Sequence, residues 1–90
     1  MEVGFDHAKD AVNQAKHGVS MAMASELEWE AALVCWVDDR FEYGEVRMIA
    51  LAPDTRALYY VAFVDRDDVR RIISLRRANR REVKYYVQSL

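Results

Sequence analysis

Residues 58–75, LYYVAFVDRDDVRRIISL, decide the fold of this chain. Residues 58–64 are rich in aromatic and β-branched side chains, which favour strands. The charged residues 65–68 form a turn signal, and residues 69–75 begin a second apolar run immediately afterwards. The stretch therefore predicts two antiparallel strands joined by a tight turn.

Two further strands are predicted upstream, where the side chains adopt a period of two. Residues 32–37 alternate until Asp38-Asp39 stops the run, and residues 46–51 alternate until Pro53-Asp54. Short loops between consecutive strands favour an antiparallel meander. Both faces of the middle strands are largely apolar, which is more than a sheet with one wet face requires. Either helices cover both faces, or a partner does.

Helical signals precede the strands. Asp6 can cap a helix over residues 7–16, which ends before Gly18, and an apolar stripe runs along this helix. The stripe consists of Ala8, Ala11, Val12 and Ala15. Ser20 can cap a short second helix over residues 21–28, because this segment has a helix-forming composition without β-branched residues.

A terminal helix is predicted after the last strand. Asn79 precedes Glu82 by three residues, as in a capping box. The apolar stripe of this helix consists of Val83, Tyr86, Val87 and Leu90. The predicted fold class is α+β, with two N-terminal helices, a four-stranded antiparallel sheet and one C-terminal helix. We expect residues 1–90 to form one domain.

The composition indicates the cellular compartment to expect for the protein. The single Cys35 cannot form an internal disulfide, and its apolar neighbours predict a buried, inert thiol, as suits a reducing cytosol. No window approaches the roughly 18–20 consecutive apolar residues of a membrane span. Acidic Glu2 and Asp6 stand where a signal peptide has basic residues. We expect a soluble, cytoplasmic protein that does not bind membranes.

Charge is distributed unevenly along the chain. Residues 1–45 hold three Lys/Arg and ten Asp/Glu, whereas residues 46–90 hold ten and five. Six of the thirteen basic side chains lie in residues 70–82 as the pairs Arg70-Arg71, Arg76-Arg77 and Arg80-Arg81. This cluster predicts an anionic partner. The alternative is a solvated basic face that pairs with nearby carboxylates, since such surface pairs are common and weak.

A series of short motifs along the chain resembles the BrnT toxins of bacterial type II toxin–antitoxin systems. The matching residues are Phe5-Asp6, Lys9, Asn13, Lys16-His17-Gly18-Val19, Asp38-Asp39-Arg40, Tyr43-Gly44-Glu45, Arg47, Arg71-Ile72-Ile73-Ser74-Leu75-Arg76, Ala78, Arg81-Glu82 and Tyr86. The chain departs from the family pattern at Ala52, Leu75 and Met21.

The resemblance implies a fold similar to RelE-type ribonucleases and an RNA-cleaving toxin that arrests translation. It also implies a cognate antitoxin, BrnA-like and of the ribbon-helix-helix type, through which alone the toxin would contact DNA. We expect the antitoxin to bind the sheet face that the chain's own helices leave uncovered and to place acidic side chains on the basic cluster.

RNA can be cut without a metal or cofactor if charge on the phosphate is stabilised and a proton is moved. Arginine suits the first task, so we expect Arg71, Arg76 and Arg80 to bind phosphate with help from Arg47. Strand alternation predicts that Ser74 shares the face of Arg76 and that Arg71 lies on the other face. The remaining RNA-binding candidates are Lys16, Arg70, Arg77 and Arg81.

His17 and Glu45 are the candidates for acid–base chemistry. Imidazole titrates near neutral pH, but Lys16-His17-Gly18 also suits the C-terminus of a helix. Glu45 can act as a base or simply occupy a hairpin loop. Two other functions remain open: a binding module without catalysis, and an inactive toxin homologue that acts as a subunit of an autorepressor complex.

Overall fold

A computed structural model describes residues 1–40 and 44–90, so Tyr43 of the BrnT-like motifs lies outside the described residues. The elements follow in the order β1 (Glu2–Gly4), α1 (His7–His17), the 3₁₀ turns η1 (Met21–Glu26) and η2 (Trp29–Ala31), β2 (Val34–Val37), β3 (Met48–Pro53), β4 (Leu58–Arg66), β5 (Val69–Arg77) and α2 (Arg80–Gln88). The predicted α+β class is confirmed.

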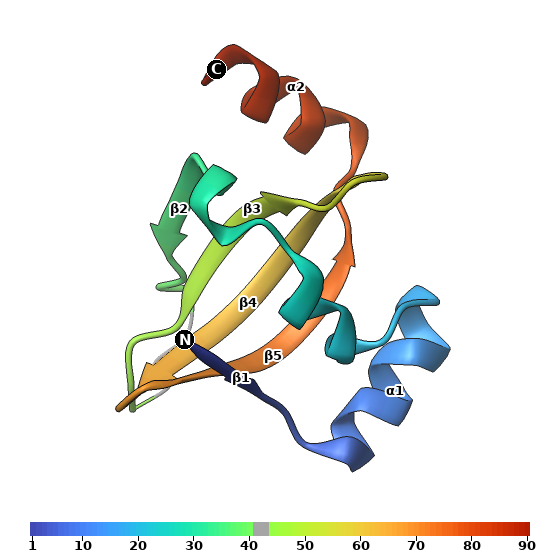
Figure 1. The fold of residues 1–90 in the computed structure, drawn as a ribbon, viewed down its shortest axis with the longest axis vertical. Coiled ribbons are helices and arrows are strands. Elements are labelled where there is room, and N and C mark those ends of the chain that lie inside the picture. Colours follow the sequence, from blue (N-terminus) through green and yellow to red (C-terminus); the bar gives the residue numbers. More distant parts are fainter. Residues whose placement is uncertain (41–43) are drawn as a thin grey trace.

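The sheet has five strands in the order β1-β5-β4-β3-β2, as Figure 1 shows. Strands β2 to β5 form the predicted antiparallel meander. The predicted four-stranded, purely antiparallel sheet is wrong, because β1 adds a parallel strand that pairs Glu2 with Val69 and Gly4 with Arg71. A three-residue strand is too short to show periodicity, and its partner lies at the other end of the chain.

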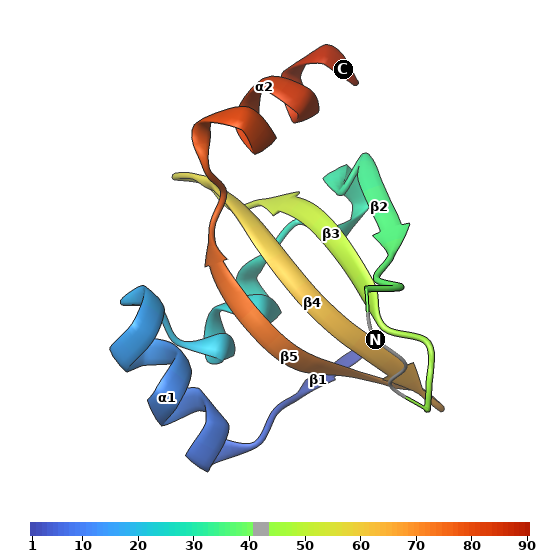
Figure 2. The ribbon, with the colours of Figure 1, turned by 180° about the vertical axis from the view of Figure 1, so that it is seen from behind.

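The two faces of the sheet are covered differently. The face in front in Figure 1 carries Tyr59, Val61 and Phe63, and η1 crosses it to form the core. We call the other face the rear face; Tyr60, Ala62 and Val64 lie on it. Figure 2 shows that α2 lies at one end of the rear face and that no helix crosses its middle. In the part of the chain that the structure describes, helices therefore cover the middle of one face only.

The predicted second helix over residues 21–28 is instead the 3₁₀ turn η1, followed by η2. Ser20 does cap it, accepting from the Ala22 N–H. The buried side chains are Met21, Ala24 and Leu27, and this spacing matches the three residues per turn of a 3₁₀ helix. Burial of this apolar row against the sheet therefore decides the conformation.

The caps of α1 are as predicted, whereas its buried face is not. Asp6 accepts from the Lys9 N–H, and Gly18 adopts the left-handed conformation with φ of 75°. The predicted apolar stripe, Ala8, Ala11, Val12 and Ala15, is exposed, and the buried residues are Asp10 and Asn13. Helix α1 is therefore anchored by polar side chains.

Two further features concern exposure. Cys35 is exposed on β2, so the prediction of a buried thiol is wrong: β2 is the last strand of the sheet and has a neighbouring strand on one side only. Within residues 1–40 and 44–90, no helix has the length and apolar character needed to cross a membrane.

Candidate functional site

A β-bulge in β5 places Arg71, Ser74 and Arg76 on the same face of the sheet. Arg76 pairs with Tyr60, Ser74 with Ala62 and Arg71 with Val64, so all three face the rear. The register shifts between Ala62 and Phe63, and the extra residue in β5 is Ile73. A bulge inserts one residue and so reverses the alternation beyond it. The prediction that Arg71 and Arg76 lie on opposite faces is therefore wrong.

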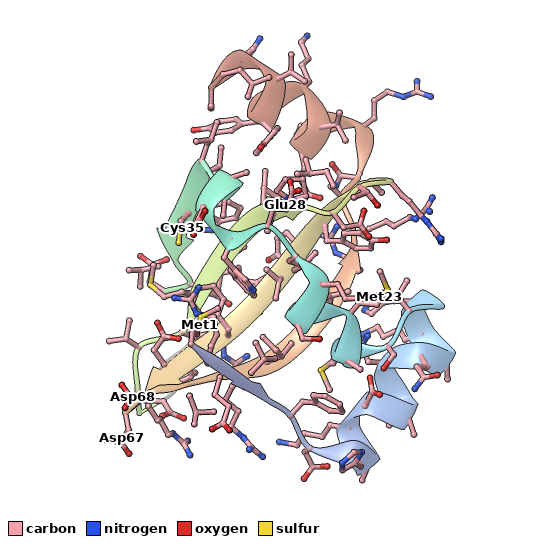
Figure 3. The ribbon with its side chains drawn as sticks, in the orientation of Figure 1. Met1, Met23, Glu28, Cys35, Asp67 and Asp68 are labelled. Atoms are coloured by element: carbon pink, nitrogen blue, oxygen red, sulfur yellow. The ribbon has the colours of Figure 1, made fainter. Side chains whose placement is uncertain are left out.

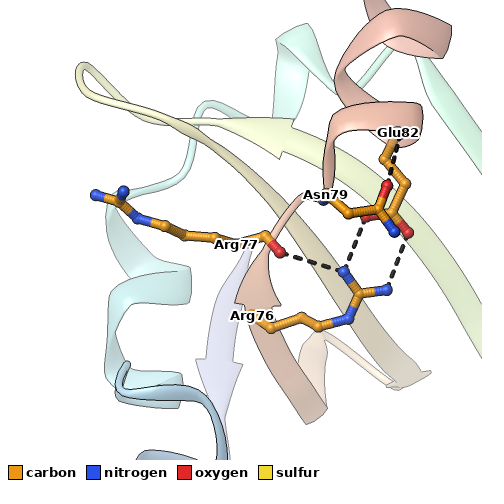
Figure 4. A network of polar contacts seen from close by, with 4 residues as sticks. All are labelled: Arg76, Arg77, Asn79 and Glu82. Atoms are coloured by element: carbon orange, nitrogen blue, oxygen red, sulfur yellow. Dashed lines mark hydrogen bonds and ion pairs between the residues drawn. The ribbon is translucent and has the colours of Figure 1, made fainter.

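Arg76 is held at the end of β5 by a fork of hydrogen bonds to Glu82 on α2 (Figure 4). Its Nη1 and Nη2 donate to the two carboxylate oxygens of Glu82 at 2.8 and 2.9 Å. Nη1 also donates to the Arg77 carbonyl at 3.2 Å, and the guanidinium lies 3.9 Å from the centroid of the Tyr60 ring. These contacts fix the orientation of the guanidinium.

The ion pair shifts both pKa values toward the charged forms. The hydrogen bonds that Arg76 donates to Glu82 raise the pKa of Arg76. Burial raises the pKa of Glu82, but the Arg76 guanidinium and the Asn79 N–H together outweigh burial and lower it below its usual value. From the sequence, Glu82 is a capping residue, a partner for the basic cluster or a base oriented by a neighbouring arginine. It serves the first two roles, because Asn79 and Glu82 do form the predicted capping box and Glu82 pairs with Arg76.

His17 ends α1 beside the middle of β5. It lines a hollow of about 300 Å³ together with Lys9, Lys16, Ile73 and Ser74, among others. Burial lowers the pKa of His17, and the positive charges of Lys16 and Arg76 lower it further. His17 is therefore neutral at neutral pH, and a ring nitrogen is available to accept a proton.

Asn13 fixes α1 against β5 at this point. Its Nδ2 donates to the Leu75 carbonyl at 2.8 Å, and its Oδ1 accepts from the Leu75 N–H at 3.1 Å. The same Nδ2 also donates to the Val19 carbonyl. The Asn13 side-chain amide thus makes the hydrogen bonds to Leu75 that a neighbouring strand would make, because β1 pairs with β5 only as far as Arg71. It holds the end of α1, with His17, next to Ser74.

Glu45 lies toward the other end of the rear face. Arg66 donates to its two carboxylate oxygens at 2.9 and 2.6 Å, and this contact lowers the pKa of Glu45. The nearby charges of Arg47 and Arg71 lower it further. Arg47 is half-buried, and its carbonyl accepts from the Asp38 N–H. Glu45 is therefore charged and bound to Arg66.

The remaining basic candidates do not converge with Arg71 and Arg76. Arg70 lies on the front face, where it pairs with Asp65 and stacks over Trp29 and Phe63 at 4.6 and 4.2 Å from their centroids. Arg77 extends away from Arg76 in Figure 4. Arg80 and Arg81 are exposed on the first turn of α2.

Sequence reasoning missed Tyr60 as part of the site. Tyr60 supports Arg76 and also contacts Trp36 edge-on at 6.1 Å between centroids. The pairing of Tyr60 with Arg76 across β4 and β5 would have indicated this role. That pairing depends on the strand register and on the bulge, which the sequence alone does not reveal. Tyr60 and Trp36 extend the site as an aromatic surface.

The site so described has three chemical capacities. Arg71 and Arg76 offer charge-assisted donors, His17 offers an uncharged base, and Ser74 offers a hydroxyl between them. Within residues 1–40 and 44–90, no three His, Cys, Asp or Glu side chains gather where they could hold a metal ion. Such a set of donors is suited to binding a phosphodiester and moving a proton.

The fold and the site define a small α+β protein with a cationic, phosphate-compatible surface on one sheet face. Residues 5–82 match the family model described as "Ribonuclease toxin, BrnT, of type II toxin-antitoxin system". The chain therefore belongs to the BrnT family of ribonuclease toxins, and membership in this family implies an antitoxin partner. No curated protein matched the chain.

Proposed function

We propose that this chain is a metal-independent endoribonuclease whose active site is formed by His17, Arg71, Ser74 and Arg76. The observation that carries the proposal is the bulge at Ile73, which brings Arg71 onto the face of Ser74 and Arg76. Without it, the two arginines would lie on opposite faces of the sheet. Family membership supports the reaction class.

In the proposed reaction, neutral His17 removes the proton from a ribose 2′-hydroxyl, whose oxygen attacks the adjacent phosphorus. The bond to the 5′-oxygen of the next nucleotide breaks, leaving a 2′,3′-cyclic phosphate and a 5′-hydroxyl. The leaving oxygen takes a proton from solvent. Arg71 and Arg76 stabilise the charge that gathers on the non-bridging oxygens, the task for which preorganised donors are most effective. No step requires a metal.

Arg76 is prepared for this role by Glu82. A guanidinium has five N–H donors. The described contacts to Glu82 and Arg77 engage Nη1 and one hydrogen of Nη2. The Nε–H and the second Nη2 hydrogen point along another edge of the guanidinium, and these two donors suit a bidentate phosphate contact. Glu82 is therefore a positioning residue.

The biological consequence we propose is translation arrest through loss of RNA, reversed by a DNA-binding, BrnA-like antitoxin. The toxin then reaches DNA only through that antitoxin. The expectation of a cytoplasmic site of action follows from an RNA substrate. The exposed Lys16, beside His17, extends the cationic surface for the RNA backbone.

The test is cleavage of cellular RNA by the purified chain and by Arg71→Ala, Arg76→Ala and His17→Ala, with and without a chelator. We expect each substitution to lower cleavage by about 10²–10³-fold, as removal of one charge-stabilising donor does. Arg56→Ala, exposed between β3 and β4, is the matched control and should cleave normally. Equal cleavage by all four variants would indicate contamination. Salt-sensitive RNA binding without product would favour the non-catalytic binding module.

A further inference from the structure

A second surface, next to the cationic site, lies between β2 and α2. A groove of about 410 Å³ runs there. It is lined by Val34, Cys35, Trp36 and Leu51 from the sheet and by Arg81, Glu82 and Tyr85 from α2. The sheet side of this groove is apolar. Since Glu82 is already paired with Arg76, Arg81 supplies the uncompensated charge among the lining residues.

Strand β2 forms the outer wall of the groove and is the last strand of the sheet. Its sequence, Val-Cys-Trp-Val, has none of the lysine or proline residues that usually protect an edge strand from pairing. Trp36 is 39% exposed and Val37 is 53% exposed. An edge of this kind is suited to accept an extended segment of another chain.

Helix α2 forms the opposite wall and carries positive charge. Arg80, Arg81 and Lys84 are exposed on it, whereas its single carboxylate, Glu82, is bound to Arg76. Tyr85 is 60% exposed and presents its ring to the groove. An occupant with apolar side chains and negative charge would therefore be complementary to the groove.

We propose that the groove binds an extended segment of the cognate antitoxin, which lies along β2 and directs carboxylates toward Arg81 and Lys84. This inference rests on the proposed function, because it takes the partner from the toxin–antitoxin pairing. RNA fits less well, since its phosphates would lose hydration against Val34, Cys35 and Leu51. A second copy of this chain fits less well too, because it would bring two cationic α2 helices together.

Such a segment would also explain inhibition without occupying the cationic site. The groove ends at Glu82, the residue that holds Arg76. A chain lying in the groove therefore covers one approach to Arg76, while Trp36 and Tyr60 become inaccessible to RNA. The antitoxin segment would then inhibit the toxin by lying beside Arg76, without competing with RNA for Arg71 and Ser74.

The test compares the affinity of the full-length chain and of Tyr85→Glu for the purified protein encoded by the neighbouring antitoxin reading frame. Tyr85→Glu removes apolar contact and adds repulsion, so we expect affinity to fall by at least about 10-fold. The matched control is Val46→Glu, because Val46 is also exposed, at 64%, and precedes the start of β3, whereas the groove contacts Leu51 further along β3. Thermal unfolding verifies that both variants fold.

Three results would overturn the inference. One is unchanged antitoxin affinity in Tyr85→Glu. Another is a loss of RNA binding while antitoxin binding stays normal, which would make the groove an RNA surface. The third is a wild-type dimer in sedimentation that Tyr85→Glu dissociates without affecting the antitoxin. RNA cleavage by the wild-type chain alone is measured separately. If the wild-type chain does not cleave RNA, the proposed function is refuted. If Tyr85→Glu nevertheless weakens antitoxin binding, the docking surface is still supported.

Discussion

The two α-helices are attached to the sheet in different ways. Helix α1 buries Asp10 and Asn13, whose side chains bond to backbone groups of η1 and β5. Figure 3 shows the ribbon of both helices and the sheet with side chains drawn as sticks. Helix α2 buries no residue and is held by the Arg76–Glu82 pair and by the Tyr86 hydroxyl, which donates to the Ala31 carbonyl at 2.7 Å. Helix α1 is thus anchored by two buried polar side chains, whereas α2 is attached through partly exposed contacts.

This difference shows that an apolar stripe need not be the face by which a helix packs. The stripe of α1 has short side chains and is exposed. Val83 and Val87 of α2 are 41% and 56% exposed, and Leu90, beyond the end of α2, is 80% exposed. Few polar contacts hold each helix, so each contact is individually important. The site lies where the two attachments meet, since α1 brings His17 and α2 brings Glu82 to β5.

The largest effect on stability is expected from Asn13→Ala in α1. It leaves the N–H of Leu75, a fully buried residue, without its partner and frees two carbonyls. We expect a loss of about 3 kcal/mol, because a buried unsatisfied group costs most of its desolvation. The melting temperature should fall by roughly 10–20 °C in a domain of this size. Differential scanning calorimetry measures this change in melting temperature.

The control for Asn13→Ala is Gln88→Ala, an exposed change in α2 that should leave the melting temperature within about 2 °C. A similar fall in both variants would mean that α1 is no more firmly anchored than α2. A normal melting temperature in Asn13→Ala would show that the bonds to Leu75 do not stabilise the fold.

A smaller effect is expected from Glu82→Gln in α2. The amide keeps one hydrogen bond but loses the charge, so we expect a cost of about 1–2 kcal/mol, modest because Arg76 remains 28% exposed. Amide hydrogen exchange should accelerate in α2 and stay unchanged in α1. The exposed change Lys84→Gln is the control. Faster exchange in both helices would contradict separate attachment.

The ion pair also makes the stability of α2 depend on pH. The pKa of Glu82 is lowered in the folded protein, so the stabilisation is complete above the usual glutamate pKa of about 4.3 and is lost as pH falls through the lowered value. In Glu82→Gln, this part of the acid-dependent loss should be absent.

The smallest expected effect concerns the pH dependence of cleavage. Because the pKa of His17 is lowered by burial and then by Lys16 and Arg76, the neutral base forms below the usual imidazole value of about 6.5. Cleavage should rise with pH through that lowered value and be level by neutral pH. Lys16→Gln removes a neighbouring charge, so the rise should move to higher pH. A pH profile of kcat/KM that is unchanged in Lys16→Gln would exclude His17 as the titrating base.

Much of the fold was predictable because its signals are local. The meander follows from strand propensity and turn residues, and the caps at Asp6, Gly18, Ser20 and Asn79 follow from backbone chemistry within four residues. The errors have non-local causes. Strand β1 depends on pairing with β5, and η1 takes its conformation from the apolar row that it buries.

The candidate site divides in the same manner. The arginine cluster and His17 could be named from residue type and motif, and the placement of Glu82 in a capping box was predicted. The grouping of Arg71 with Arg76 could not be predicted, since it depends on one unpaired residue, Ile73, in the register between β4 and β5. Asn13 and Tyr60 were missed as supports for the site because their partners are set by packing.

The sequence by itself determined the α+β class, the uneven charge, the caps and membership in the BrnT family, because each depends on neighbouring residues or on motif order. Only the tertiary structure decided which arginines share a face, how each helix is attached and where an apolar groove lies open. The physical reason is that register, ion pairing and burial are energies between residues far apart in the chain, and their sign depends on what the folded sheet places opposite each side chain.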